Sequence, residues 1–257
     1  MINEEILSRE QIIREVTPIG NGAHVFAPKE WMGEKVVVIR NPEPSLKKRI
    51  LKIIEPHLEN ILGVYLYGSY TRSEQRQDSD IDLLIISNKK IKIKEKGFEI
   101  ITLEKGKIRE SIKIAPVLIY SAIIEAKPII NSGLLDELKR NYNPTAGNFK
   151  EYIKETKNII KINEEIPSPY SIILRLRGIY IIDRLISGKT YSHAGFREWV
   201  LKDVKDHIDS KINFDYLYNA YLRIKSGLRA SVKEDVMRMI LSILKNKTKK
   251  LEDKLYG

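Results

Sequence analysis

The 257-residue chain contains no cysteine, which excludes disulfide scaffolds, thiolate zinc sites, iron–sulfur clusters and cysteine nucleophiles. Its four histidines are scattered without the spacing of a metal site, so we assign them no catalytic role. The sequence also lacks the GxxxxGKS/T phosphate loop and the motif set of protein kinases. A metal ion bound by this chain is therefore expected to be a hard one with oxygen ligands.

Long apolar runs are absent as well, and none approaches the roughly 18 residues that a membrane span needs. Residues 1–10 are acidic, whereas a secretory signal is first basic and then apolar. We therefore expect a soluble, cytoplasmic protein without a membrane partner. Because 42% of the residues are apolar and 31% charged, the chain can bury a core, and its length favours two or more domains.

Basic residues outnumber acidic ones by 45 to 34, which gives a formal net charge of +11. Lys and Arg raise the local concentration of polyanions, so partners that carry phosphate are expected: a nucleoside triphosphate, RNA or DNA. The alternative is that the charges form a solvated surface, as in heat-adapted proteins.

Changes in residue pattern divide the chain into three segments: 1–44, 45–145 and 146–257. In the first, the short runs AHVFA and KVVVI predict a β-hairpin. In the second, apolar spacing predicts a helix over 46–59, and the runs GVYLY and IDLLII predict buried strands at 63–67 and 81–86. The run IKIAPVLIY predicts a further buried strand over 112–120.

After Asn143-Pro144 the apolar spacing becomes helical, which predicts a bundle of four or five helices. The helical segments are 149–162, 170–186, 193–208, 214–228 and 232–255. The predicted fold class is thus α+β, with a mixed sheet and packed helices followed by an all-α helical bundle.

One constellation carries chemistry, in the stretch GSYTRSEQRQDSDIDLLI that joins the two predicted strands. Side chains two residues apart in a strand point to the same face, so Asp80 and Asp82 project together. Two adjacent like charges are costly unless a cation neutralises them. Oxygen ligands suit Mg²⁺, with Mn²⁺ as an alternative, and Mg²⁺ commonly binds one or two carboxylates together with substrate phosphates.

Gly68 and Ser69, at the end of the first of these strands, supply the complementary half of the site. Glycine lets the backbone approach a phosphate, while the serine hydroxyl and the following amides donate hydrogen bonds. Arg72 follows one turn later and either contacts the nucleotide or braces the loop against a carboxylate. Gly68, Ser69 and Arg72 are therefore the predicted nucleotide-binding residues.

This pattern of Gly-Ser, ten residues and Asp-x-Asp resembles the nucleotidyltransferase superfamily that includes DNA polymerase beta. Residues 45–87 are especially similar to the minimal archaeal and bacterial nucleotidyltransferases. The resemblance implies a polymerase beta-like fold and magnesium-dependent transfer of a nucleoside monophosphate from a triphosphate, with ATP preferred here, to an acceptor. Asp80 and Asp82 would be the catalytic residues and metal ligands, and pyrophosphate would be released.

The family's two-metal members carry a third carboxylate on a later strand. In the predicted strand over 112–120, the corresponding face offers only Lys113, Ala115 or Val117. Glu99 and Glu110 are nearby in sequence and are interpreted as surface residues. Either the acceptor supplies its own base, one metal suffices, or the enzyme is degenerate.

The helical half carries further candidates for binding an acceptor of unknown identity: Arg175, Arg184 and Tyr191. In similar transferases a helical domain faces the nucleotide cleft. Arg175 and Arg184 are nine residues apart and so lie on different faces of a helix, which means that one of them could reach the cleft. The alternative is that these side chains cap the surface of the bundle.

The stretch PIGNGAHVFAPKEWMGEKVVVI resembles archaeal relatives of swapped-hairpin regulators, in which a hairpin pairs between chains and binds DNA. The hairpin is therefore expected to mediate a homodimer, to contact nucleic acid through Lys29, Lys35 and Arg40, or to pack on the catalytic sheet.

The leading hypothesis is a magnesium-dependent nucleotidyltransferase that acts on a hydroxyl or phosphate of a small molecule, protein or RNA. The alternatives are a non-catalytic regulator that senses nucleotides or binds DNA, and an antitoxin-like partner protein, on the same fold.

Overall fold

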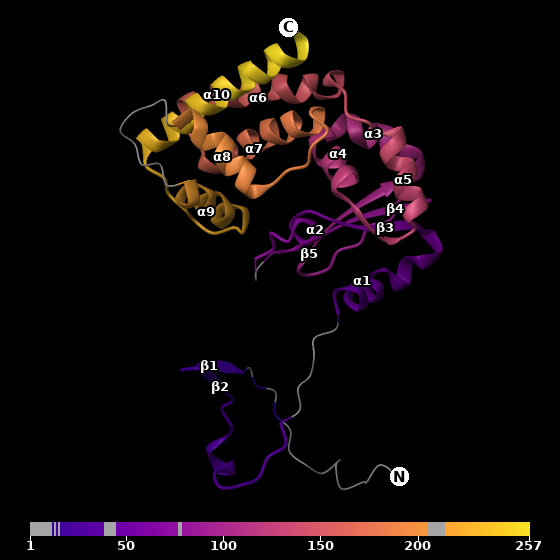
Figure 1. Cartoon of the computed structure of the whole chain (residues 1–257), viewed down its shortest axis with the longest axis vertical. Coiled ribbons are helices and arrows are strands. Elements are labelled where there is room, and N and C mark those ends of the chain that lie inside the picture. The colour runs from indigo at the N-terminus through magenta and orange to yellow at the C-terminus, as the bar shows by residue number, and fades with distance from the viewer. Residues whose placement is uncertain (1–11, 13, 15, 39–44, 77–78, 205–213) are drawn as a thin grey trace. The chain divides into compact units, whose positions relative to one another are not determined.

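The computed structural model describes residues 12, 14, 16–38, 45–76, 79–204 and 214–257 (Figure 1). The chain separates into two compact units, residues 1–44 and 45–257. None of the helices in the described ranges is long and apolar enough to cross a membrane.

The first unit contains an antiparallel hairpin of two short strands, β1 (Thr17–Ile19) and β2 (Gly22–His24), followed by a 3-10 turn, η2 (Lys29–Trp31). The predicted strand over KVVVI is wrong for residues 35–38, which form no strand, while Ile39 and Arg40 lie outside the described residues. β-branched residues favour a strand only when a neighbouring strand packs against them. Val37 and Val38 are instead 80% and 73% exposed.

The second unit opens with helix α1 (Leu46–Ile54), whose N-terminus is capped by the Ser45 side chain. The predicted helix continues to Asn60 only as a 3-10 segment, η3 (Glu55–Asn60). Pro56 explains this change, because proline lacks the N–H that an α-helix requires and restricts the residue before it.

A mixed four-stranded sheet lies at the centre of this unit, as the predicted fold class requires. Its strands are β3 (Ile61–Tyr67), β4 (Ile81–Ser87), β5 (Phe98–Glu104) and β6 (Lys127–Ile130), in the order β5-β4-β3-β6. Strand β3 is antiparallel to β4 and β6, while β4 and β5 are parallel. The C-terminal end of β3 therefore lies beside the N-terminal ends of β4 and β5.

The strand predicted over 112–120 is wrong. That stretch forms the end of α3 (Ile108–Ile114), which follows the turn η4 (Lys105–Lys107), and the start of α4 (Pro116–Glu125). Proline is favoured in the first turn of a helix, and Pro116 occupies that position. The continuous apolar run reflects a helix buried in the core, a pattern that periodicity alone does not distinguish from a buried strand. Helix α5 (Ser132–Asn141) follows β6.

The predicted helical half is confirmed. After the turn η5 (Ala146–Phe149), it contains the helices α6 (Lys150–Glu165), α7 (Pro169–Ile186), α8 (His193–Val204), α9 (Phe214–Lys225) and α10 (Glu234–Tyr256). The predicted extension of α8 over 205–208 lies outside the described residues.

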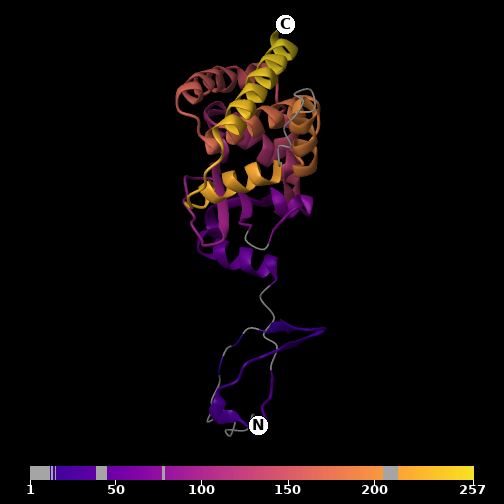
Figure 2. The ribbon, with the colours of Figure 1, turned by 90° about the vertical axis from the view of Figure 1, so that its left-hand side faces the viewer.

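The two faces of the sheet belong to separate cores. Tyr65 and Leu84 belong to a large apolar cluster that continues through α4 and α7 to α10. Val64 and Leu83, from the opposite face, pack with Ile50 and Ile54 of α1. Figures 1 and 2 accordingly show α1 on the side of the sheet opposite the helical half. The sheet and the bundle thus share one apolar core, and residues 45–257 form one compact unit. The predicted domain boundary at residue 145 stays a prediction.

Candidate active site

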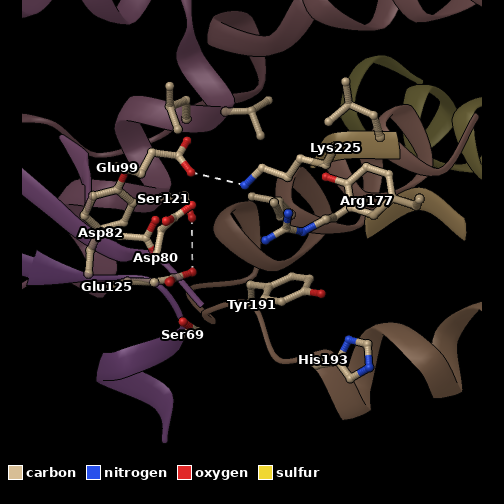
Figure 3. A pocket seen from close by; sticks show the side chains of 18 of the residues that line it. Ser69, Asp80, Asp82, Glu99, Ser121, Glu125, Arg177, Tyr191, His193 and Lys225 are labelled. Carbon is tan, nitrogen blue, oxygen red and sulfur yellow. Dashed lines mark hydrogen bonds and ion pairs between the residues drawn. The ribbon is translucent and has the colours of Figure 1, made fainter. Parts of the chain in front are cut away.

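A cleft of about 970 Å³ lies between the end of the sheet and the helical half, lined from both sides (Figure 3). The sheet side contributes the Gly-Ser turn after β3, the start of β4 and the start of β5. The helical half contributes side chains of α7 and α9 and of the segment that leads into α8. The sequence motif and the bundle therefore face the same cavity.

The sheet side of the cleft is acidic. Asp80 immediately precedes β4, and Asp82 lies within it, directly opposite Tyr67 of β3 and Glu99 of β5. Residues in register on neighbouring strands point to the same face. Figure 3 shows Asp80, Asp82 and Glu99 gathered on one side of the cavity. Glu99, interpreted from sequence as a surface residue, thus lines the cleft beside the Asp-x-Asp pair.

Asp82 has an unusual electrostatic environment. Burial, together with the negative charge of Glu99, raises the pKa of Asp82 to about 6, although Lys225, the backbone N–H of Ser69 and Arg177 act in the opposite direction. The net effect is that the ionised carboxylate is poorly compensated. A bound cation would supply the missing positive charge, which is a physical reason for this pair to bind metal.

The donor set fits Mg²⁺. In the described part of the chain, no group of three or more His, Cys, Asp or Glu side chains is arranged as a protein-only metal site. Mg²⁺ does not need such a cage, because it retains water and uses substrate phosphates together with one or two carboxylates. Asp80 and Asp82 provide those carboxylates.

Gly68 is required by the close approach of Asp82. Its backbone has φ +74°, in the region that favours glycine, and a Cβ placed there would overlap Oδ2 of Asp82. The short helix α2 (Ser69–Arg72) begins immediately afterwards. The Gly-Ser turn and the second aspartate therefore form one tightly packed unit.

Arg72 is held by carboxylates of the protein itself. Its Nε donates to Glu74 at 2.8 Å, and its Nη1 pairs with the buried Glu125. The guanidinium also lies over the ring of Tyr191, 5.0 Å from the centroid. Of the two roles considered for Arg72, these contacts favour bracing the loop.

The opposite wall is basic. Arg177 of α7 is partly buried and lies 4.8 Å from the centroid of Tyr191, and its buried Nε has no hydrogen-bond partner. Nζ of Lys225 on α9 pairs with Oε2 of Glu99 at 3.1 Å. Burial acts to lower the pKa of Lys225, whereas the ion pair with Glu99 acts to raise it. The net effect is a raised pKa, so the ammonium is charged. Figure 3 shows both cations facing the acidic edge.

The candidates in the helical half divide between the cleft and the bundle surface. Arg175 and Tyr191 line the cleft, where Arg175 stacks on Tyr152 and pairs with Glu155 at 3.4 Å. Arg184 does not line it and donates instead to the backbone oxygen of Thr190.

Arg177, Lys225 and His193 line the cleft but are not among the residues predicted from the sequence to bind nucleotide or acceptor. The backbone N–H of His193 donates to Glu74, while burial and Arg76 lower the pKa of its imidazole, which is therefore neutral at neutral pH. A charged residue in an apolar helix, as in ILRLRG, was the available signal for Arg177. For Lys225, on an amphipathic helix, no comparable signal exists.

Family comparisons agree with this geometry. Residues 48–134 match the family described as "Polymerase beta, Nucleotidyltransferase". The chain therefore contains a nucleotidyltransferase domain of the polymerase beta superfamily, which confirms the main resemblance stated from the sequence. Residues 9–39 match a second family, described as "Putative transposon-encoded protein (DUF2080)". That description assigns no function, so the swapped-hairpin interpretation stays a prediction.

Individual relatives cover the chain unevenly. Spectinomycin 9-adenylyltransferase of Campylobacter jejuni is 44% identical over 52 residues, which is 20% of each protein. The crystal structure of a spectinomycin adenyltransferase from Enterococcus faecialis with ATP and spectinomycin aligns with 79% of this chain and 97% of its own, at 17% identity and a TM-score of 0.46.

A nucleotidyltransferase-like protein from Exiguobacterium sibiricum aligns with 80% of this chain and 75% of its own, at 11% identity and a TM-score of 0.30. TM-scores this low are insufficient for either structure to support an inference about the site.

Proposed function

We propose that this protein is a magnesium-dependent nucleotidyltransferase that transfers the nucleoside monophosphate of ATP to an acceptor hydroxyl and releases pyrophosphate. The observation that carries this proposal is the grouping of Asp80, Asp82 and Glu99 at one end of the sheet, facing Arg177 and Lys225 across the cleft. ATP is chosen as the nucleotide because the relative from Campylobacter jejuni is named as an adenylyltransferase.

Asp80 and Asp82 would hold the magnesium ion. When bound, the ion neutralises charge on the phosphates and favours attack at the α-phosphate. The poorly compensated charge of Asp82 supports this assignment, since the ion would relieve it.

The triphosphate is held from both sides of the cleft in this proposal. Ser69 donates from the sheet side, where Gly68 allows the backbone to come close. From the helical side, Arg177 directs its guanidinium into the cleft toward the acidic edge (Figure 3), where its positive charge can pair with phosphate oxygens.

Glu99 is the proposed general base. It would accept the proton of the acceptor hydroxyl while the hydroxyl oxygen bonds to the α-phosphorus. The bond from the α-phosphorus to the oxygen bridging to the β-phosphate breaks, and pyrophosphate leaves with that oxygen. A base is needed for a hydroxyl but not for an ionised phosphate, so Glu99 favours a hydroxyl acceptor.

The main reason to consider a non-catalytic protein was the missing third carboxylate on the strand predicted over 112–120. That strand does not exist, and Glu99 on β5 lies beside Asp82 instead. This register supports the enzymatic proposal over the regulator and antitoxin-like alternatives.

The test uses ATP labelled in its α-phosphate, Mg²⁺ and a panel of hydroxyl compounds, with the full chain. We expect label to move to an acceptor in the wild type and not in Asp80→Asn/Asp82→Asn. Far-ultraviolet circular dichroism checks that the variant is folded, and Asp253→Asn, an exposed change on α10, is the matched control. Equal transfer by the wild type and the double variant contradicts the proposal.

A further inference from the structure

One wall of the cleft is apolar and exposed. Ile114 is 85% exposed, Leu118 is 46% exposed and Leu174 is 37% exposed, and all three line the cavity together with Val117 and Ile181. Large apolar side chains that gather in a cavity, rather than singly on a surface, indicate a place where a ligand is desolvated.

Part of this wall comes from the two helices that follow β5, the strand that carries Glu99. Helix α3 follows β5, packs against it and ends at Ile114, while α4 begins two residues later at Pro116. Ile114 and Glu99 both line the cleft. The acceptor hydroxyl must reach Glu99 under the proposed function, so an apolar wall of the same cleft is suited to the rest of the acceptor.

Four of the six described carboxylates of the cleft pair with protein cations. Glu74 and Glu125 pair with Arg72. Glu155 pairs with Arg175, and Glu99 pairs with Lys225. The two remaining carboxylates, Asp80 and Asp82, are the proposed magnesium ligands. An acceptor with several positive charges would therefore find no unpaired carboxylate among these residues, and its desolvation would be uncompensated.

Building on the proposed function, we infer that the acceptor is a small molecule with at most one positive charge, whose hydroxyl lies next to an apolar face. That face packs on Ile114, Leu118 and Leu174, and the hydroxyl points to Glu99. The inference separates this chain from the relative named for spectinomycin, because spectinomycin is a dibasic aminocyclitol.

The first test measures binding without catalysis, using the uncharged fluorescent amine N-phenyl-1-naphthylamine and the full chain. We expect the dye to bind, and Ile114→Glu or Leu118→Glu to weaken binding roughly tenfold, because a carboxylate replaces an apolar contact. Ile166→Glu is the matched control: Ile166 is 74% exposed at the end of α6 and does not line the cleft.

Two results of this test overturn the inference. One is an equal effect of Ile114→Glu and Ile166→Glu on dye binding. The other is competitive displacement of the dye by MgATP, which would mean that the apolar wall holds the nucleobase.

The second test compares acceptors by pyrophosphate release in the presence of MgATP. We expect uncharged alicyclic or aromatic alcohols to be better acceptors than spectinomycin, and Leu118→Glu to raise their KM without changing the KM for ATP. Faster turnover with spectinomycin than with any uncharged alcohol overturns the inference while supporting the proposed function. Absence of MgATP binding is a separate result that contradicts the proposed function, whatever the dye shows.

Discussion

Asp82 of β4 and Glu99 of β5 are direct neighbours in the parallel register, so their carboxyl groups lie on the same edge of the cleft. Glu99 raises the pKa of Asp82, and Lys225 pairs with Glu99. This relationship assigns separate roles to the two carboxylates in the proposed reaction, one as metal ligand and the other as base.

Glu99→Gln is expected to lower kcat by on the order of 100-fold or more, because an amide cannot accept the hydroxyl proton. The affinity for MgATP should be retained, since the aspartates are unchanged. Steady-state kinetics and nucleotide titration check the two expectations. Glu104→Gln, at the far end of the same strand, is the matched control and should leave kcat unchanged. Equal rates for Glu99→Gln and the wild type would remove Glu99 from the mechanism.

Asp82→Asn is expected to stabilise the metal-free protein at pH 7.5. The pKa of Asp82 is about 6 in the folded protein against 3.8 for the unperturbed group, so the folded state binds the proton more readily. Stability contributed by the protonated form is fully present below about pH 4 and is lost as the pH rises through about 6. The variant avoids that loss, which is on the order of 3 kcal/mol.

Urea unfolding in a chelator measures this effect at pH 4 and pH 7.5. The advantage of Asp82→Asn should vanish at the lower pH, and Asp253→Asn should change the free energy of unfolding at neither. Added Mg²⁺ should raise the stability of the wild type alone, because only the wild type keeps both ligands. A variant less stable than the wild type at pH 7.5 without metal would contradict the electrostatic argument.

Gly68→Ala is expected to abolish MgATP binding and to destabilise the fold by roughly 1–3 kcal/mol, because the methyl group overlaps Asp82 in a strained backbone conformation. Gly188→Ala separates these causes. Gly188 has φ +67° with no atom near its missing Cβ, so that variant carries strain without overlap. Nucleotide titration should show normal binding for Gly188→Ala, and normal binding for Gly68→Ala as well would refute the close-approach account.

Arg72→Met should destabilise the protein by about 3 kcal/mol, because the carboxylate of Glu125, only 4% exposed, loses its partner. Arg175→Met is the comparison: its partner Glu155 is 62% exposed, and the expected cost is about 1 kcal/mol or less. Denaturant unfolding measures both.

The double variant Arg72→Met/Glu125→Gln distinguishes bracing from nucleotide contact. If Arg72 braces the loop, removing both charges should recover part of the stability and the affinity for MgATP. Recovered stability with lost affinity would instead make Arg72 a nucleotide ligand.

The sequence predicted those parts of the site that a local pattern defines. The Gly-Ser turn and the Asp-x-Asp pair are contiguous with strands whose apolar runs are distinctive, and the helical spacing after residue 149 identified the bundle. Glu99 was harder to place, because KKIKIKEKGFEIITLEK alternates apolar and charged residues over a length greater than one strand. Only pairing with β4 selects Phe98–Glu104, and with it the register that brings Glu99 to Asp82.

Arg177 and Lys225 depend on long-range packing. Each lies on a helix far along the chain from the sheet, and only the shared core orients α7 and α9 toward the cleft. The strand wrongly predicted over 112–120 has a related cause. A continuous apolar run is compatible with a buried helix or a buried strand, and the choice was made by the tertiary structure.

The central claim is that Asp80 and Asp82 bind a magnesium nucleotide. Calorimetric titration of the full chain with ATP, with and without Mg²⁺, tests it most directly. The account predicts binding that requires Mg²⁺ and is lost in Asp80→Asn/Asp82→Asn, while Asp253→Asn binds as the wild type does. Binding of equal affinity in the double variant, or in the absence of Mg²⁺, would contradict it.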